Sequence, residues 1–180
     1  RYIDFSVIDS LRRMKMMIAQ EVRRKQLGNN IKLGAGGIRE IEFIVQVFQL
    51  IRGGRIKELQ QRNLLSVLPL LVAHGELSKE SREVLEQAYQ FLRRVENILQ
   101  ALNDQQTQTL PDNELDRARL LCVLGFSGWQ GFIDVLEQHM QAVHAKFISL
   151  IGEESPNHQA PSEHWMALWH SQWSDEESIA

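Results

Sequence analysis

The sequence predicts an all-α protein: a mostly antiparallel helical bundle, similar to a four-helix bundle, of about six helices with a short C-terminal helical appendage. Apolar residues recur at helical spacing along almost all of the 180 residues. No segment shows the sustained alternation of apolar and polar residues that predicts a strand. Glycine, proline and capping residues separate the helical stretches and set their expected bounds.

The first two helices are expected on either side of a glycine-rich loop. The first ends by Gly28, where a Gly-Asn-Asn sequence breaks an apolar stripe made of Phe5, Ile8, Leu11, Ile18 and Val22. The loop contains Gly34, Gly36 and Gly37. The second helix ends before a Gly-Gly pair, and one of its faces carries Ile38, Ile41, Val45 and Phe48.

The third and fourth helices have the clearest start signals. Asn63 is the expected N-cap of the third helix, which runs to His74 and is followed by Gly75. Pro69 should bend this helix or split it in two, because proline lacks a backbone N–H and clashes with the preceding turn. Ser78 is the expected N-cap of the long fourth helix, whose heptad-like stripe is Leu85, Ala88, Leu92, Val95, Leu99 and Leu102.

Two further helices are expected after a polar loop over residues 103–113. The fifth helix covers residues 114–124 and ends at Gly125. Ser127 and Gln130 have the spacing of a capping box and begin the sixth helix. Its inner stripe is Phe132, Leu136, His139, Val143, Phe147 and Leu150.

The end of the chain is expected to be separate from the bundle. Residues 153–163 have the composition of a linker, with two prolines, and beyond them Trp165, Trp169 and Trp173 share one helix face. This stripe either docks on the bundle or awaits a part of the parent protein. We therefore expect a bundle domain over residues 1–152, and a linker with a short Trp-bearing helix over residues 153–180.

Charge and cysteine content limit the possible functions. The net charge is −3, but residues 1–60 carry +6 and residues 61–180 carry −9. The basic first third favours an anionic ligand near it, with ordinary solvated faces as the alternative, while the overall acidity argues against nucleic-acid binding. The single cysteine, Cys122, lies in an apolar stretch and predicts a core thiol of a reduced cytoplasmic protein.

No membrane span, signal peptide or complete active site is evident. No run of 18 apolar residues and no basic-then-apolar leader occurs. Because the chain starts with Arg1 and runs straight into a helical pattern, we expect it to be a piece of a longer protein. The six histidines lack metal-ligand spacing, so no metal site is predicted, and His139 is expected to be a hydrogen-bonded core residue.

The segment that suggests chemistry is residues 32–43, Lys-Leu-Gly-Ala-Gly-Gly-Ile-Arg-Glu-Ile-Glu-Phe. Adjacent glycines before a helix let the backbone approach an anion or another backbone closely, and Lys32 and Arg39 flank this approach. The segment lacks the residues of a Walker loop or a dinucleotide fingerprint. A tight loop between two packed helices is the alternative interpretation.

A polar ribbon on the following helix needs partners. Arg39, Glu42, Gln46 and Gln49 lie at i, i+3, i+7 and i+10 on a helix that is otherwise apolar. A covering domain would supply those partners, and the alternative is a solvent-facing stripe. On the long fourth helix, four polar residues could form either intrahelical pairs or interdomain contacts, namely Arg93, Arg94, Glu96 and Asn97.

Four ordered blocks of the sequence resemble the bifunctional glutamine synthetase adenylyltransferase/adenylyl-removing enzymes. They are Lys-Leu-Gly-Ala-Gly-Gly-Ile-Arg-Glu-Ile-Glu-Phe-Ile-Val-Gln (residues 32–46), Gln-Leu-Ile-Arg-Gly-Gly-Arg (49–55), Tyr-Gln-Phe-Leu-Arg-Arg-Val-Glu-Asn (89–97) and Gln-Thr-Gln-Thr-Leu-Pro (106–111). A related Gly-Gly-Leu-Arg-Asp-Ile pattern occurs in the uridylyltransferase that modifies the PII signal protein. The Glu-Ile-Glu-Phe version here favours the adenylylating enzymes.

The resemblance implies a helical domain that packs on an N-terminal nucleotidyltransferase domain, which removes AMP from an adenylylated tyrosine of glutamine synthetase by phosphorolysis. Arg39-Glu40 supports the N-terminal, adenylyl-removing half of these enzymes, because the opposite half carries Thr or Val followed by Asp at this place. The Gly-Ser and Asp-x-Asp motifs that hold the metal and triphosphate are absent, so this chain alone is expected to be inactive. The resemblance thus implies Mg2+ and ATP, ADP or phosphate in the parent enzyme, none of them bound to this piece.

Two roles follow from the resemblance. In the first, the domain completes the nucleotide site: Lys32 and Arg39 offset phosphate charge, the Gly34–Gly37 loop meets the catalytic domain, and Glu40 or Glu42 positions a basic group or the outer shell of the metal. Gln46 and Gln49 extend this surface as an interdomain ribbon. In the second, the chain is a regulatory module that binds the PII signal protein or glutamine synthetase, with the acidic Trp-bearing tail as its main feature.

Overall fold

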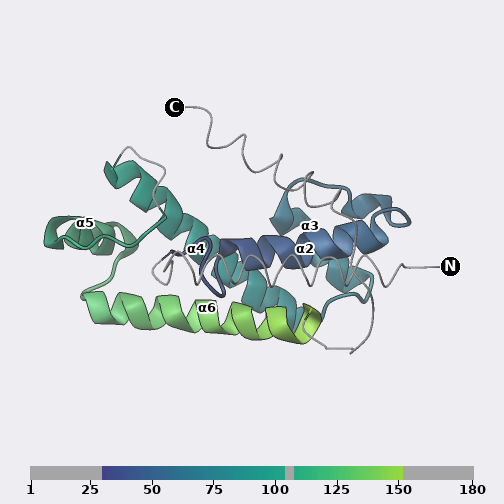
Figure 1. Ribbon diagram of the computed structural model, residues 1–180. Helices are drawn as coiled ribbons and strands as arrows, with labels where there is room; N and C mark the ends of the chain where they lie inside the picture. The colour runs from purple at the N-terminus through teal and green to yellow at the C-terminus, as the bar shows by residue number, and fades with distance from the viewer. Residues whose placement is uncertain (1–29, 104–107, 152–180) are drawn as a thin grey trace, which may run out of the picture. The chain divides into compact units, whose positions relative to one another are not determined.

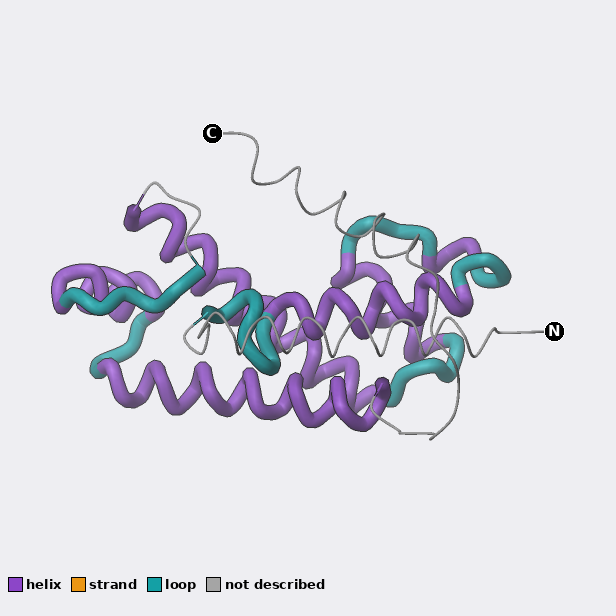
Figure 2. The backbone as a smooth tube through the Cα atoms, viewed as in Figure 1, coloured by secondary structure: helices purple, strands orange, loops and turns teal. Residues whose placement is uncertain are grey.

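The computed structural model describes residues 30–103 and 108–151, and within them the chain is helical (Figure 1). The elements are α2 (Ile38–Arg52), the short 3-10 helix η2 (Lys57–Leu59), α3 (Leu64–Ala73), α4 (Lys79–Asn103), α5 (Glu114–Leu124) and α6 (Trp129–Ile151). Figure 2 shows only helices and loops in this part of the chain. The all-α prediction is confirmed. The helix expected before Gly28 and the Trp-bearing appendage lie outside the described residues.

The helix ends are set by the residues that the sequence indicated. The Asn63 side chain accepts a hydrogen bond from the Leu65 amide, and the Ser78 hydroxyl accepts one from the Ser81 amide at 3.1 Å. Gly75 and Gly125 follow α3 and α5 with φ of 72° and 80°. This left-handed conformation, which glycine adopts without strain, ends both helices.

One local prediction about the helices is wrong, and one of the two alternatives for another is excluded. Pro69 does not split α3, which is one continuous helix in which Leu68 and Leu71, on either side of the proline, are fully buried. The capping box at the start of α6 does not form through Gln130. Its side chain donates instead to Asp134 at 2.8 Å, one turn further along the helix.

The core forms where α2, α4 and α6 pack together. The heptad stripe of α4 is buried as expected, with Leu85, Ala88, Leu92, Val95 and Leu99 at most 1% exposed. Burial of one such leucine stabilises the fold by about 1.5–3 kcal/mol, so this stripe holds the bundle together.

Helix directions follow from the contacts between helices. Arg93 of α4 meets Glu42 of α2, and Lys146 of α6 meets Glu80 at the start of α4, so α4 runs antiparallel to both neighbours. Helices α2 and α6 run parallel, since Glu40 meets His144 and the next turn brings the Phe43 and Phe147 rings to 5.7 Å. The predicted antiparallel arrangement therefore holds for α4 but not for the α2–α6 pair.

Two residues expected in the core are exposed. Cys122 is exposed, because α5 buries only Leu120 against its neighbours and the rest of this apolar stretch faces outward. Leu150, at the end of the inner stripe of α6, is 37% exposed. No single helix among the described residues is long and apolar enough to cross a membrane, although α5 and α6, bent by 66°, meet that test as a pair.

Candidate functional site

The glycine-rich turn before α2 is fixed by backbone pairing to the segment that precedes α5. The Ile31 amide donates to the Gln108 carbonyl at 3.0 Å, and Asn30 forms an antiparallel bridge with Thr109. The Asn30 side chain, in a residue only 6% exposed, accepts the amides of Lys32 and Leu33 at 3.0 and 2.8 Å. Residues 108 and 109 of one sequence block therefore lie beside the residues that lead into the 32–46 block.

The glycines of this turn are required by close backbone packing. Gly36 has φ of 75°, and a Cβ added there would lie 1.8 Å from the Met140 carbonyl oxygen of α6. A Cβ on Gly37 would lie 2.6 Å from the Ile31 and Lys32 carbonyl oxygens. Only glycine lets the turn enter between α2 and α6 at these distances.

The amides of the turn already have acceptors within the chain. The Gly34 amide donates to the Asn30 carbonyl, the Gly37 amide to the Gly34 carbonyl, and the Gly36 amide to the Glu40 carboxylate at 2.9 Å. These three amides are not available to a phosphate. The structure thus favours the alternative interpretation of this segment, a tight turn between packed helices.

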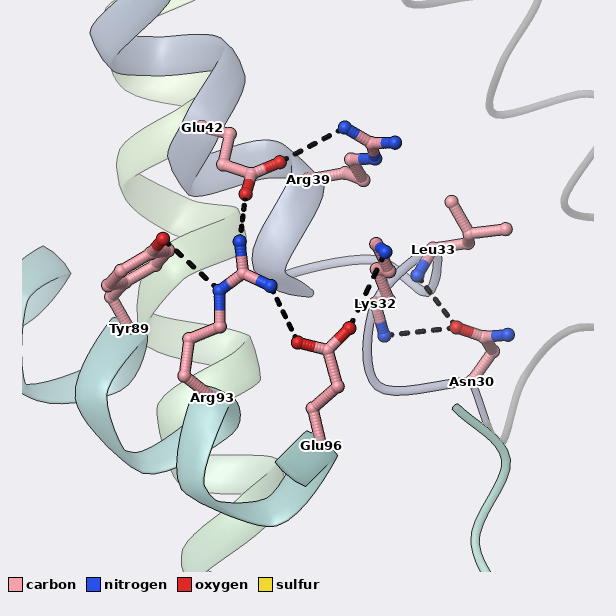
Figure 3. Close-up of polar contacts among 8 residues, drawn as sticks. All are labelled: Asn30, Lys32, Leu33, Arg39, Glu42, Tyr89, Arg93 and Glu96. Atoms are coloured by element: carbon pink, nitrogen blue, oxygen red, sulfur yellow. Dashed lines mark hydrogen bonds and ion pairs between the residues drawn. The ribbon is translucent and has the colours of Figure 1, made fainter. Parts of the chain in front are cut away.

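The charged residues of α2 and α4 form one ion-pair network beside the turn (Figure 3). Arg93 occupies its centre: its guanidinium donates to Glu42 at 2.6 Å, to Glu96 at 2.7 Å and to the Tyr89 hydroxyl at 3.1 Å. Glu42 also accepts from Arg39 at 3.2 Å, and the Lys32 amine lies 3.5 Å from Glu96. Two of the sequence blocks, residues 32–46 and 89–97, thus meet in this network.

The network is largely withdrawn from solvent. The side chains of Glu96 and Glu42 are 3% and 16% exposed, whereas those of Lys32, Arg39 and Arg93 are 18%, 27% and 36% exposed. Glu96 is therefore buried, while Glu42 and the three cations are partly exposed. Burial lowers the pKa of Arg93, but its hydrogen bonds to Tyr89 and Glu96 and the charge of Glu42 outweigh this, so the pKa is raised and the side chain stays charged.

Glu96 and Glu42 act as fixed anchors for Lys32 and Arg39. One oxygen of Glu96 is buried without a hydrogen bond among the described residues, and its nearest charge is the Lys32 amine at 3.5 Å. A buried carboxylate is costly without a cation, so Lys32 is held over it. Arg39 is held in the same way by Glu42.

The other predicted site residues lie apart from this network. Glu40 accepts the Gly36 amide and pairs with His144 of α6 at 3.0 Å. Gln49 donates to the Leu59 and Gln61 carbonyls, which fixes the loop after α2, and Gln46 is exposed. The residues of the expected ribbon therefore have three different surroundings and do not form one continuous face.

The sequence left two alternatives for the polar residues of α4, intrahelical pairs or interdomain contacts, and the structure shows an intrahelical pair for Arg93 and Glu96. Arg93 makes both an intrahelical pair with Glu96 and an interhelical pair with Glu42. The spacing i, i+3 of Arg93 and Glu96 is evident in the sequence, but the sequence does not show that Glu42 of α2 is the third residue of the network.

His139 is half-buried, and its ring packs 4.8 Å from the Phe91 ring where a hydrogen bond was expected. Among the described residues, no group of three His, Cys, Asp or Glu side chains could hold a metal ion.

With this geometry established, comparison with known proteins assigns the family. A family model described as GlnD PII-uridylyltransferase matches residues 12–151. The chain belongs to this family. A bifunctional glutamine synthetase adenylyltransferase/adenylyl-removing enzyme of Psychromonas ingrahamii is 54% identical over 178 residues, which cover 99% of this chain and 19% of that enzyme. The resemblance seen in the four sequence blocks is confirmed.

The matched range includes the candidate site. All residues that the structure describes fall inside the matched range of the GlnD PII-uridylyltransferase family. The chain spans about a fifth of the length of the adenylyltransferase relative. The residues of the ion-pair network therefore lie in the part of the chain that the family model matches.

Proposed function

We propose that this chain is a helical domain of an enzyme that regulates glutamine synthetase by adenylylation and deadenylylation. The observation that carries the proposal is the 54% identity to the bifunctional relative, which extends over 99% of the chain and includes all four sequence blocks. The domain serves the half that removes AMP by phosphorolysis, as the Arg39-Glu40 pair indicates. The enzyme acts in the cytoplasm, and its nucleotidyltransferase domain supplies the residues for Mg2+ and ATP, ADP or phosphate.

Within that enzyme, the network supports the nucleotide site. The support for this role is the arrangement of charge. Three partly exposed cations, Lys32, Arg39 and Arg93, pair with the buried carboxylate of Glu96 and the half-buried carboxylate of Glu42. Cations held in place before the substrate arrives stabilise phosphate charge without the cost of reorganisation. The glycine turn contributes by placing Lys32 and the start of α2, rather than by offering its own amides.

The experiment uses the full-length enzyme with adenylylated glutamine synthetase and phosphate. Lys32→Gln and Arg39→Ala each should raise the KM for phosphate or lower kcat by about tenfold, which corresponds to about 1.4 kcal/mol of lost interaction. Arg82→Ala is the matched control, because Arg82 forms a similar pair with Glu86 on α4 outside the network. If both network variants phosphorolyse at the rate of the unsubstituted enzyme, the supporting role is ruled out.

A regulatory protein-binding role is the second candidate. The observation that favours it is the apolar surface of α5, where Leu115 and Val123 are 62% and 54% exposed. Large exposed apolar side chains on one short helix are typical of a protein contact. Calorimetric titration of the PII signal protein, unmodified and uridylylated, into the enzyme tests this role. Leu115→Ser and Val123→Ser together should abolish the binding, and unchanged binding would exclude this surface.

A further inference from the structure

The loop after α2 carries cations that have no acidic partner in the described part of the chain. We call residues 53–62 the basic loop. Arg55, Lys57 and Arg62 are exposed, and no described ion pair includes them. The one acidic residue of the loop, Glu58, pairs with His74 at 3.2 Å. Within the described residues, the basic loop therefore presents three exposed cations without an acidic partner.

The conformation of the basic loop is fixed from within. Gln49 of α2 donates to the Leu59 and Gln61 carbonyls at 2.7 and 2.8 Å, and Gln60 donates back to the Gly53 carbonyl at 2.7 Å. Leu59 is fully buried and anchors the loop to the bundle. A loop that is already ordered loses little conformational entropy on binding, so its cations are suited to recognition.

The position of the basic loop indicates the size of what it binds. Helix α2 has 15 residues and so is about 22 Å long, and it separates the basic loop from the network at its N-terminal end. If the network lies at the nucleotide site, the basic loop is too far away to contact the same nucleotide. A protein footprint of about 800 Å² per partner does extend over such a distance.

The neighbouring surface has the composition of a protein contact. Gln46 and Leu50 lie one turn apart on the exposed face of α2 that leads into the basic loop, and Leu50 is 66% exposed. Protein–protein contacts combine an apolar centre with a polar rim, and Leu50 beside the exposed cations of the basic loop offers both elements. The three cations are exposed, whereas a small ligand usually binds in a concave site that encloses most of its surface, which argues against a small anionic ligand here.

We propose that the basic loop, together with Leu50, binds an acidic surface of the macromolecular substrate while its modified side chain occupies the distant nucleotide site. This inference rests on the proposed function and adds to it a second contact for the same substrate. Complementary charge of this kind guides association and sets the affinity for the protein, and salt weakens it. The chemical step itself is not affected by a contact this far from it.

The test compares a large and a small substrate on the full-length enzyme. The large substrate is adenylylated glutamine synthetase, and the small one is a short peptide with an adenylylated tyrosine. The loop variant is Arg55→Glu with Arg62→Glu. The control variant is Lys79→Glu with Arg119→Glu, which changes the net charge equally at exposed positions on α4 and α5. A milder variant, Arg55→Gln with Arg62→Gln, guards against misfolding, which circular dichroism and the melting temperature would detect.

We expect the loop variant to raise the KM for adenylylated glutamine synthetase by about tenfold or more at low salt, with kcat unchanged. The milder variant should show a smaller rise, and both effects should shrink in 0.5 M salt. Phosphorolysis of the peptide should be the same in all variants. An unchanged KM for the protein substrate, or an equal rise in the control variant, overturns the inference while the proposed function stands. An unsubstituted enzyme that phosphorolyses neither substrate overturns both.

Discussion

Replacement of Gly36 by alanine should destabilise the fold more than the same change at any other left-handed glycine of the described chain. At φ of 75°, any side chain costs about 1–2 kcal/mol. The new Cβ would also lie 1.8 Å from the Met140 carbonyl oxygen, where contacts under 3.0 Å essentially do not occur. Because the obstacle is backbone, α6 must move away from the turn, and such overpacking costs about 1–3 kcal/mol more. The total is about 2–5 kcal/mol.

Two glycines provide matched controls for this change. Gly75 has nearly the same φ, 72°, but nothing lies within 4 Å of an added Cβ, so Gly75→Ala should cost only the conformational part, about 1–2 kcal/mol. Gly54 has neither a left-handed φ nor a close neighbour, so Gly54→Ala should have almost no effect.

Urea unfolding followed by circular dichroism measures all three variants. The difference between Gly36→Ala and Gly75→Ala isolates the contact of the turn with α6, and we expect it to be about 1–3 kcal/mol. Equal losses of unfolding free energy in these two variants would show that the turn is open rather than packed against α6. The assignment of the glycines to packing would then be refuted.

Two further predictions concern the half-buried His139 and Gln49, which holds the basic loop by hydrogen bonds. Burial lowers the pKa of His139 below its ordinary 6.5, so as the pH falls the unfolded chain binds the proton before the folded chain does. Stability that is present at neutral pH is therefore lost as the pH falls through about 6.5. His139→Phe should flatten this part of the pH profile of the unfolding free energy in urea, and an unchanged slope would contradict the assignment. Gln49→Ala removes two hydrogen bonds to the basic loop and should lower the free energy of unfolding by about 1–2 kcal/mol. Hydrogen exchange should then be faster at the amides of residues 53–62, and unaltered exchange would show that Gln49 does not hold the loop.

The helices were predictable because their signals are local. The heptad stripe of α4 fixes its buried face without reference to any other segment, and Leu92 and Val95 are fully buried as expected. The caps Asn63 and Ser78 act on amides two and three residues away, so their pattern is complete within a short window. The exposure of Cys122 was not predictable in this way, because it depends on which face of α5 has neighbours.

The candidate site was predictable only in part, because its partners are distant in sequence. The sequence indicated Lys32, Arg39 and Glu42 but not that Arg93, 51 residues from Glu42, lies between two carboxylates. The turn glycines were recognised as special, yet the reason lies in Met140, more than one hundred residues away. A glycine that lets the backbone approach an anion and one that lets it approach another backbone have the same sequence pattern.

The most direct test of the account is a double-mutant cycle between the two sequence blocks that meet in the network. Glu42→Gln, Arg93→Met and the double variant are made in the full-length enzyme, and phosphorolysis of adenylylated glutamine synthetase is measured for each. If Glu42 and Arg93 act as one unit that holds Lys32 and Arg39 in place, each single change lowers the rate of phosphorolysis. The rate of the double variant is then no lower than that of the more severe single variant. Rates unaffected by all three changes, or losses that multiply in the double variant, would contradict the account.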